Sequence, residues 1–167
     1  MESGDVVIKT AEAMRVAEAT AESPGFGSDN LGPVFAELYP VVLAHLGAAG
    51  VRPGVCVAWY DGPHDDGTVT VHGGFGIGAA VLPPHARVRV TDLPAVEVAA
   101  VVHRGPMDDI VTLYGALVRW IEDNGYERSG PSRELYREWR EDEPSANVTE
   151  IELPITRRPR AGSAGAE

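Results

Sequence analysis

The chain has 167 residues, of which 44% are hydrophobic and 23% charged, and this composition excludes a disordered polypeptide. Its 25 acidic and 14 basic residues give a formal net charge of -11. That balance argues against a nucleic-acid-binding surface, which needs clustered Lys and Arg. The single cysteine, Cys56, excludes an internal disulfide bond.

The sequence predicts neither secretion nor membrane insertion. No apolar stretch approaches the roughly 18 residues of a bilayer span, and the N-terminal MESGDVVIKT lacks the basic start and apolar run of a signal peptide. We therefore expect a cytoplasmic protein with no membrane partner. Residues 157–167, which include a few arginines, are expected to be a solvated, disordered tail rather than a DNA-binding arm.

The first half of the chain is predicted to contain a strand, a helix and a hairpin. Residues 5–21 favour an extended segment, and the Pro- and Gly-rich 22–30 favour a turn. Apolar residues at helical spacing predict a helix over 31–48, which Pro40 should kink or interrupt. Two β-rich segments, 55–61 and 68–78, flank the loop GPHDDG and predict a hairpin.

The second half repeats this order. Residues 87–102 predict an alternating strand region that is broken at 92–94. The spacing of apolar residues predicts a helix over 106–124 with the stripe Ile110, Leu113, Tyr114, Leu117 and Ile121. Residues 132–139 and 147–155 predict the last two strands.

The two halves can be aligned with each other. Residues 13–20 match 95–102, and CVAWY (56–60) matches SRELY (132–136), which places Tyr60 on Tyr136. We therefore predict an α+β domain over residues 1–156, made of two strand-helix-strand-strand units at about 5–80 and 87–156. The expected architecture is an antiparallel sheet with helices on one face and a central ligand cleft between pseudo-twofold halves.

Common catalytic and cofactor motifs are missing from the sequence. There is no GxSxG, HExxH or P-loop signature. The group His64, Asp65 and Asp66 is more typical of a solvated loop tip than of a metal site. The glycine-rich segment 73–78 leads into no helix, so it does not predict a nucleotide site. No cofactor and no metal are expected.

Glu150 is the strongest single site residue in the sequence. In the last strand, alternation places Glu150 and Glu152 on one face and the apolar Ile151 and Leu153 on the other. We expect the apolar face to meet the helices, which leaves Glu150 on a face that lines the cleft. Alternation alone also permits the simpler interpretation that Glu150 and Glu152 form the solvated side of the sheet.

Aromatic residues fall in the hairpin strands that should border this cleft, namely Trp59, Tyr60, Tyr136 and Trp139. Glu134 shares a strand face with Tyr136. Aromatic walls bind flat apolar or cationic molecules by stacking and cation–π contact. The alternative for each ring is ordinary packing in the core.

Residues 103–139 and 147–155 together resemble the second half of GyrI-like domains, also known as the effector-binding domains of AraC-type and MerR-type regulators. The resemblance is carried by Gly105-Pro106, by Trp120-Ile121 to Gly125-Tyr126, by Glu134-Leu135-Tyr136 and by Thr149 to Ile155. The first half matches more weakly, through VAWYD (57–61), in which Trp59 replaces the first aromatic residue of the family motif.

The resemblance implies two repeats around a central cleft and places the glutamate of the last strand, Glu150, in that cleft. It also matches Glu134 and Tyr136 to motif positions. The chain has no room for a helix-turn-helix, so it resembles the stand-alone members. Some of those sequester toxic compounds, one type protects gyrase, and some hydrolyse cyclopropane-containing genotoxins.

Three functions remain open at this stage. The first is a stand-alone protein that holds a lipophilic aromatic or cationic compound against Glu150, Glu134 and the four rings, in drug or toxin sensing or resistance. The second is a hydrolase of strained-ring genotoxins in which Glu150 acts as general base or acid. The third is a protein-binding, gyrase-protecting module. No nucleic-acid partner is expected, and an oligomer is compatible with the sequence.

Overall fold

The structure is a computed structural model that describes residues 5–159. The first half contains the predicted helix and hairpin, and the segment 5–21, predicted as one extended segment, forms two consecutive strands. These elements are β1 (Val7–Ala11), β2 (Met14–Ser23), α1 (Ser28–Ala48), β3 (Cys56–Asp61) and β4 (Val69–Gly76).

The second half repeats this order with three additional elements, a short strand and two single-turn 3₁₀ helices. Its elements are β5 (Arg89–Leu93), β6 (Val96–Arg104), η1 (Met107–Asp109), α2 (Ile110–Asp123), β7 (Tyr126–Arg128), β8 (Arg133–Glu138), η2 (Pro144–Ala146) and β9 (Val148–Arg157). The predicted helix over 106–124 is therefore a 3₁₀ turn followed by α2.

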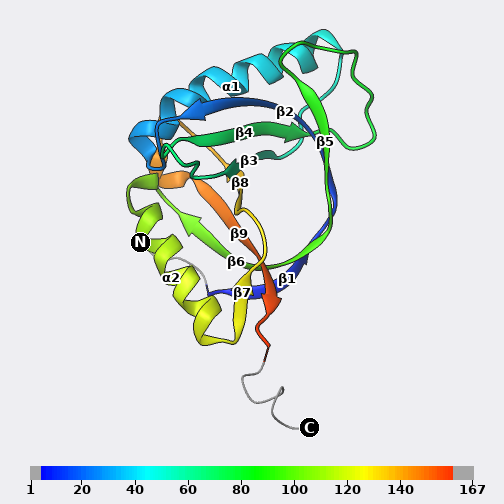
Figure 1. Ribbon diagram of the computed structural model, residues 1–167. Helices are drawn as coiled ribbons and strands as arrows, with labels where there is room; N and C mark the ends of the chain where they lie inside the picture. The colour runs from blue at the N-terminus through cyan, green and yellow to red at the C-terminus, as the bar shows by residue number, and fades with distance from the viewer. Residues whose placement is uncertain (1–4, 160–167) are drawn as a thin grey trace.

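The strands form one antiparallel sheet in the order β1-β6-β9-β8-β3-β4-β2-β5, and β7 pairs with β9 (Figure 1). This order is symmetric about the β3–β8 pair, in which Ala58 lies opposite Glu134. The predicted alignment of 13–20 with 95–102 superposes Met14 on Val96. In the sheet, Met14 pairs with Leu93 and Val96 pairs with Ala11. The same alignment also superposes Ala11 on Leu93, so the pairing confirms the internal repeat.

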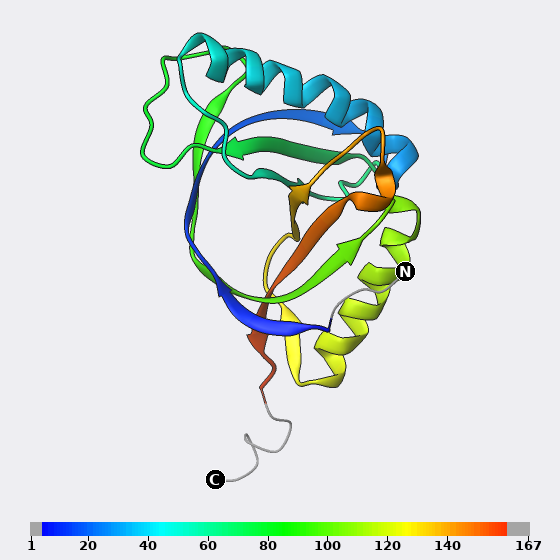
Figure 2. The same ribbon diagram turned by 180° about the vertical axis from the view of Figure 1, so that it is seen from behind.

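The sheet curls because each edge strand continues along the chain into an inner strand near the opposite edge, β1 into β2 and β5 into β6. β1 pairs with β6 and β2 with β5 in one continuous register, so they form a long ribbon that bends around one side of the molecule (Figures 1 and 2). At Gly74 of β4 a Cβ atom would lie 2.0 Å from the backbone oxygen of Ala17 in β2, so only glycine permits this close strand approach.

Both helices lie on one face of the sheet, which we call the helix face. α1 packs its buried residues Val34, Leu38, Val42 and Leu46 on β2 and β4. α2 packs Leu117 and Ile121 against residues of β6 and β9. The opposite surface, which we call the inner face, is covered by the curled sheet itself, as shown by the buried cluster of Val16, Val57, Trp59, Leu93 and Leu135.

α1 differs from the sequence-based expectations in two respects. The helix runs without interruption through Pro33 and Pro40, because its apolar side packs on the sheet along its length and that packing outweighs the hydrogen bonds lost at the prolines. By length and composition alone, its 21 residues are also long and apolar enough to cross a membrane, contrary to the prediction that no stretch approaches that length. In this structure that apolar character serves contacts with β2 and β4.

The predicted tail begins inside the last strand. β9 continues through Arg157, and the backbone N–H of Arg158 donates to the carbonyl of Gly125 at 2.8 Å. These residues therefore belong to the folded domain. The rest of the predicted tail, from residue 160, lies outside the described residues.

Candidate functional site

A cavity of about 950 Å³ lies on the helix face between α1 and α2, above the central strands β3 and β8. A cavity of this size can hold a drug-sized ligand. Within the described residues its lining contains three charged side chains, those of Arg128, Glu134 and Glu141, and is otherwise largely apolar and aromatic.

Strand alternation directs the polar groups of the cavity. Every second residue of β3 and β8 points to the helix face, which brings Tyr60, Glu134 and Tyr136 into the lining. Ala58, opposite Glu134, is too small to fill the space above the pair. The floor of the cavity is therefore a carboxylate at the centre of the pseudo-symmetric sheet.

Glu134 is 5% exposed and is held by tyrosine hydroxyls. Tyr114 Oη donates to its Oε2 at 2.6 Å, and Tyr136 Oη donates to its Oε1 at 2.7 Å. No Lys, Arg or His of residues 5–159 forms an ion pair with it. Burial raises the pKa of Glu134, and the hydrogen bonds from the tyrosines offset part of that rise.

The tyrosines around Glu134 remain hydrogen-bond donors. Burial, and then the nearby Glu134 charge, raise the pKa values of Tyr114 and Tyr136, so both hydroxyls stay protonated. Tyr60 is 6% exposed, and its Oη lies in the same group but has no hydrogen-bond partner in the part of the chain that the structure describes. Its hydroxyl still lies close enough to Glu134 to help lower the pKa of that carboxyl.

Aromatic rings form the walls of the cavity. Phe35 of α1 stacks on Tyr39, with centroids 5.5 Å apart, and meets Tyr60 and Tyr136 edge-on at 6.5 and 6.3 Å. Trp139 meets Tyr136 edge-on at 5.5 Å. These rings give the cavity faces of negative electrostatic potential close to a carboxylate.

Cys56 also lines the cavity, in contact with Tyr39. Burial raises the pKa of its thiol to about 11, although a hydrogen bond with Tyr39 opposes the rise. The thiol is therefore neutral at physiological pH and unreactive as a nucleophile.

Four of the six predicted site residues come together in this cavity: Tyr60, Glu134, Tyr136 and Trp139. Sequence reasoning missed three lining residues. Phe35 and Tyr39 fall in the helix predicted over 31–48 and were not considered for the site, and Tyr114 was counted in the apolar stripe of the second helix. The signal that could have found Tyr114 is its hydroxyl, because a tyrosine in a buried stripe needs a polar partner.

The prediction that Glu150 lines the cleft is wrong. Glu150 lies on the inner face, where Arg137 Nε and Nη2 donate to its Oε1 at 3.2 and 2.9 Å and Lys9 forms a second ion pair. Burial opposes its ionisation, but hydrogen bonds from Lys9, Glu152 and Arg137 lower the pKa of Glu150 to about 2. Strand alternation correctly placed Glu150 and Ile151 on opposite faces of the sheet. The cavity, however, lies on the face that carries the helices, and not on the face of Glu150.

Trp59 is also on the inner face, so the prediction that it forms a cleft wall is wrong. Its ring stacks on His72 with centroids 4.9 Å apart, in the cluster with Val57 and Leu135. Because Trp59 and Tyr60 are neighbours in one strand, only one of them can face the cavity. The side chain of Trp59 therefore does not shape the ligand space directly.

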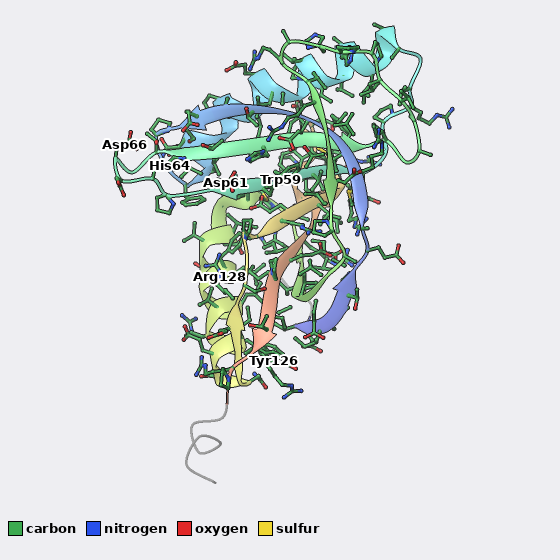
Figure 3. All side chains as sticks on the ribbon, turned by 45° about the vertical axis from the view of Figure 1, so that its right-hand side comes forward. Trp59, Asp61, His64, Asp66, Tyr126 and Arg128 are labelled. Carbon is green, nitrogen blue, oxygen red and sulfur yellow. The ribbon has the colours of Figure 1, made fainter. Side chains whose placement is uncertain are left out.

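His64 and Asp66 lie at the tip of the β3–β4 hairpin (Figure 3). Asp66 accepts hydrogen bonds from the backbone and hydroxyl of Thr68, as expected of a solvated turn. Among residues 5–159 no group of three His, Cys, Asp or Glu side chains is arranged to hold a metal ion.

Solved structures with the same fold include regulators and ligand-binding proteins. The C-terminal domain of EcmrR has a TM-score of 0.75 and 20% identity over 92% of this chain and 98% of that domain. In the EcmrR–DNA complex the TM-score is 0.77 at 20% identity, over 93% of this chain, which spans 58% of that protein. SAV2435 bound to tetraphenylphosphonium has a TM-score of 0.58 and 13% identity, over 92% and 94% of the two chains.

A hydrolase encoded by lin2189 from Listeria innocua also shares the fold, with a TM-score of 0.60 and 12% identity over 90% and 91% of the two chains. No curated protein sequence matches the chain significantly. The family described as GyrI-like small molecule binding domain matches residues 4–156, which is nearly the whole chain. The protein therefore belongs to the GyrI-like small molecule binding domain family.

Proposed function

We propose that this domain binds lipophilic cations with aromatic groups in the cavity between α1 and α2, and that Glu134 supplies the opposite charge. The observation that carries the proposal is the state of Glu134. It is 5% exposed, it is hydrogen-bonded to tyrosines only, and it has no cationic partner within residues 5–159.

The energetics of a buried charge favour a cationic ligand. Burying a carboxylate without a positive partner costs several kcal/mol, and hydroxyl hydrogen bonds recover only part of that cost. A cation in the cavity would supply the missing charge where water is largely excluded. It would gain more from Glu134 than it would from a carboxylate in water.

The walls favour an aromatic, poorly hydrated cation over a small inorganic one. Phe35, Tyr60 and Tyr136 offer ring faces and edges next to the carboxylate, and Trp139 lies exposed at the mouth. Rings of this kind attract cations and stack on flat groups. The relative SAV2435, whose structure holds tetraphenylphosphonium, supports this ligand class.

We further propose that binding without chemistry is the main activity, and that the protein senses or sequesters drugs or toxins in the cytoplasm. The alternative is a hydrolase. Its supporting observation is that burial raises the pKa of Glu134 beside the cavity, which suits a general base. Glu150, the base expected from the sequence, lies on the other face of the sheet and is ion-paired.

Calorimetric titration with tetraphenylphosphonium tests the binding proposal. We expect the parent protein to bind it, and Glu134→Gln to weaken binding by about tenfold or more, because one charge-assisted contact is worth about 1.5 to 3 kcal/mol. The neutral triphenylphosphine oxide should bind both proteins alike. Glu150→Gln is the matched control, since it makes the same change on the inner face.

Equal affinity of the parent and Glu134→Gln for the cation would contradict the proposal. Mass spectrometry of incubated strained-ring electrophiles separates the alternative, because a hydrolase gives a product one water heavier that is lost in Glu134→Gln. Unchanged compounds after incubation, together with tight binding of the cation, support a binding protein.

A further inference from the structure

The charged groups of the cavity are separated along the β3–β8 pair. Because the two strands are antiparallel, Trp59 lies opposite Arg133 at one end and Cys56 lies opposite Tyr136 at the other. Glu134 is near the middle. Tyr60 and Ser132 therefore belong to the first end, while Glu141 follows Tyr136 at the second.

Arg128 lies at the end marked by Tyr60 and Ser132. It is in β7, opposite Ile155 of β9, whose side chain packs on the helix face, so Arg128 also points to that face. Figure 3 shows it beside α2. Arg128 is exposed and forms no ion pair with any carboxylate of residues 5–159. A cationic side chain that lines an apolar cavity and has no carboxylate partner in the protein can form an ion pair with an acidic group of a ligand.

The N-terminus of α1 lies in the same lining, through Gly27 and Ser28. α1 has 21 residues, and no side chain caps its first turn. The free N–H groups and the dipole of such a helix favour negative charge at this end. Asp29, the acid of the first turn, is exposed and does not line the cavity.

Tyr60 supplies an independent indication of a ligand acceptor. Its ring packs edge-on against Phe26, just before the start of α1, with centroids 5.6 Å apart. Its hydroxyl is buried, faces the cavity near Glu134 and forms no hydrogen bond of good geometry in the described part of the chain. Buried hydroxyls are almost always hydrogen-bonded, so an acceptor on a bound molecule would complete this one.

We propose that the cavity takes zwitterions: aromatic compounds with a cationic centre above Glu134 and an acidic group at the Arg128 end. There the Arg128 guanidinium pairs with the acid, and the positive end of the α1 dipole in the same lining favours the negative charge. This inference rests on the proposed function and narrows its ligand class, because a cavity that served simple cations alone would be disfavoured by a positive charge in its lining.

A matched pair of fluorescent ligands tests the inference. Rhodamine B carries a delocalised cation and a carboxylate, and its ethyl ester is the same cation without the acid. Fluorescence anisotropy gives the Kd of each for the full chain. We expect Arg128→Gln to raise the Kd of rhodamine B about fivefold and to change that of the ester less than about twofold, as befits one partly screened ion pair.

Two further variants sharpen the result. Tyr60→Phe removes only the hydroxyl and should raise the Kd of rhodamine B about threefold, with little effect on the ester. Arg119→Gln, an exposed arginine of α2 that is not in the lining, is the control and should change neither Kd.

The outcomes are distinguishable. Equal effects of Arg128→Gln on acid and ester, or no effect on either, overturn the acid-binding end while leaving the proposed function intact. If the parent binds neither dye nor tetraphenylphosphonium, the proposed function fails as well. A weaker affinity of Arg128→Gln for rhodamine B, with an unchanged affinity for the ester, supports the inference.

Discussion

Glu134 and Glu150 are glutamates of neighbouring strands with almost equal burial, 5% and 6% exposed, and their partners differ in kind. Glu150 meets Lys9 and Arg137 on the inner face. Glu134 meets only tyrosine hydroxyls on the helix face. The pKa of Glu150 is accordingly lowered and that of Glu134 raised. At equal burial, the presence or absence of a cationic partner therefore decides the direction in which the carboxyl pKa shifts.

The largest change in stability should come from removing the two cationic side chains that pair with Glu150. In the double variant Lys9→Met, Arg137→Met, Glu150 becomes a buried carboxylate without a cationic partner and keeps only its hydrogen bond with Glu152. We expect the free energy of unfolding to fall by about 2 kcal/mol, which is less than for a fully buried pair because both cations are partly solvated. Urea denaturation measures this. A loss below about 0.5 kcal/mol would show that Glu150 does not depend on its ion pairs.

The pH dependence of stability tests the inner face further. Burial, and then Glu150, raise the pKa of Glu152 to about 7, while Glu150 stays near 2. Both unfolded glutamates titrate near 4.3, so the pair adds stability as pH rises from 2 to that value and loses it again as pH rises to 7. We expect a variation on the order of 1 to 2 kcal/mol, allowing for coupling. Thermal melts of the parent and Glu152→Gln from pH 3 to 8 measure it. The parent should lose more stability above about pH 5, because both proteins keep the loss that comes from Glu134 and only the parent has Glu152.

Glu134→Gln should stabilise the empty protein, in contrast to the loss expected from unpairing Glu150. Its raised pKa means that the folded state disfavours the charged form, so stability falls as pH rises through the folded pKa, and the amide avoids this penalty. A gain of about 1 kcal/mol at pH 8 is expected. Calorimetric melts check it, and a lower Tm in Glu134→Gln would mean that the tyrosine hydrogen bonds fully compensate the carboxylate.

The smallest effect should come from the hydrogen bonds to Glu134. Tyr114→Phe removes the donor to Oε2 without changing the wall of the cavity, and we expect the affinity for tetraphenylphosphonium to change by about threefold or less. Val118→Ala on α2, which packs in the core and is not in the lining, serves as a control. A loss as large as that in Glu134→Gln would make the tyrosine an essential part of the cation site.

Much of the fold could be predicted from sequence, because the repeat and the period of apolar residues are local signals. The alignment of Tyr60 with Tyr136 and of 13–20 with 95–102 agrees with the strand pairing. The face of the cavity could not be predicted. Alternation shows which residues share a face, but the closure of the ribbon, a long-range contact, decides which face is covered by the sheet and which is left open between the helices.

The site was predicted in part for the same reason. The predictions for Glu134, Tyr60 and Tyr136 are correct because strand alternation points these side chains to the helix face, where the cavity lies. The same alternation points Glu150 and Trp59 to the inner face. The ion pairs of Glu150 join β9 to residues far away in sequence, such as Lys9 in β1, and no local pattern reports them. Helix residues such as Tyr39 and Tyr114 combine packing with the cavity wall, a dual role that periodicity does not separate.

The position of Ala58 has a consequence for the evolution of ligand choice. Ala58 faces Glu134 across the centre of a duplicated sheet, so the two halves hold equivalent places and only one of them is acidic. A single codon change to an acid at residue 58 would set two carboxylates side by side beneath the same aromatic walls. Under the proposed function, a site for one positive charge would thereby become a site for dications, with no change to the scaffold around it.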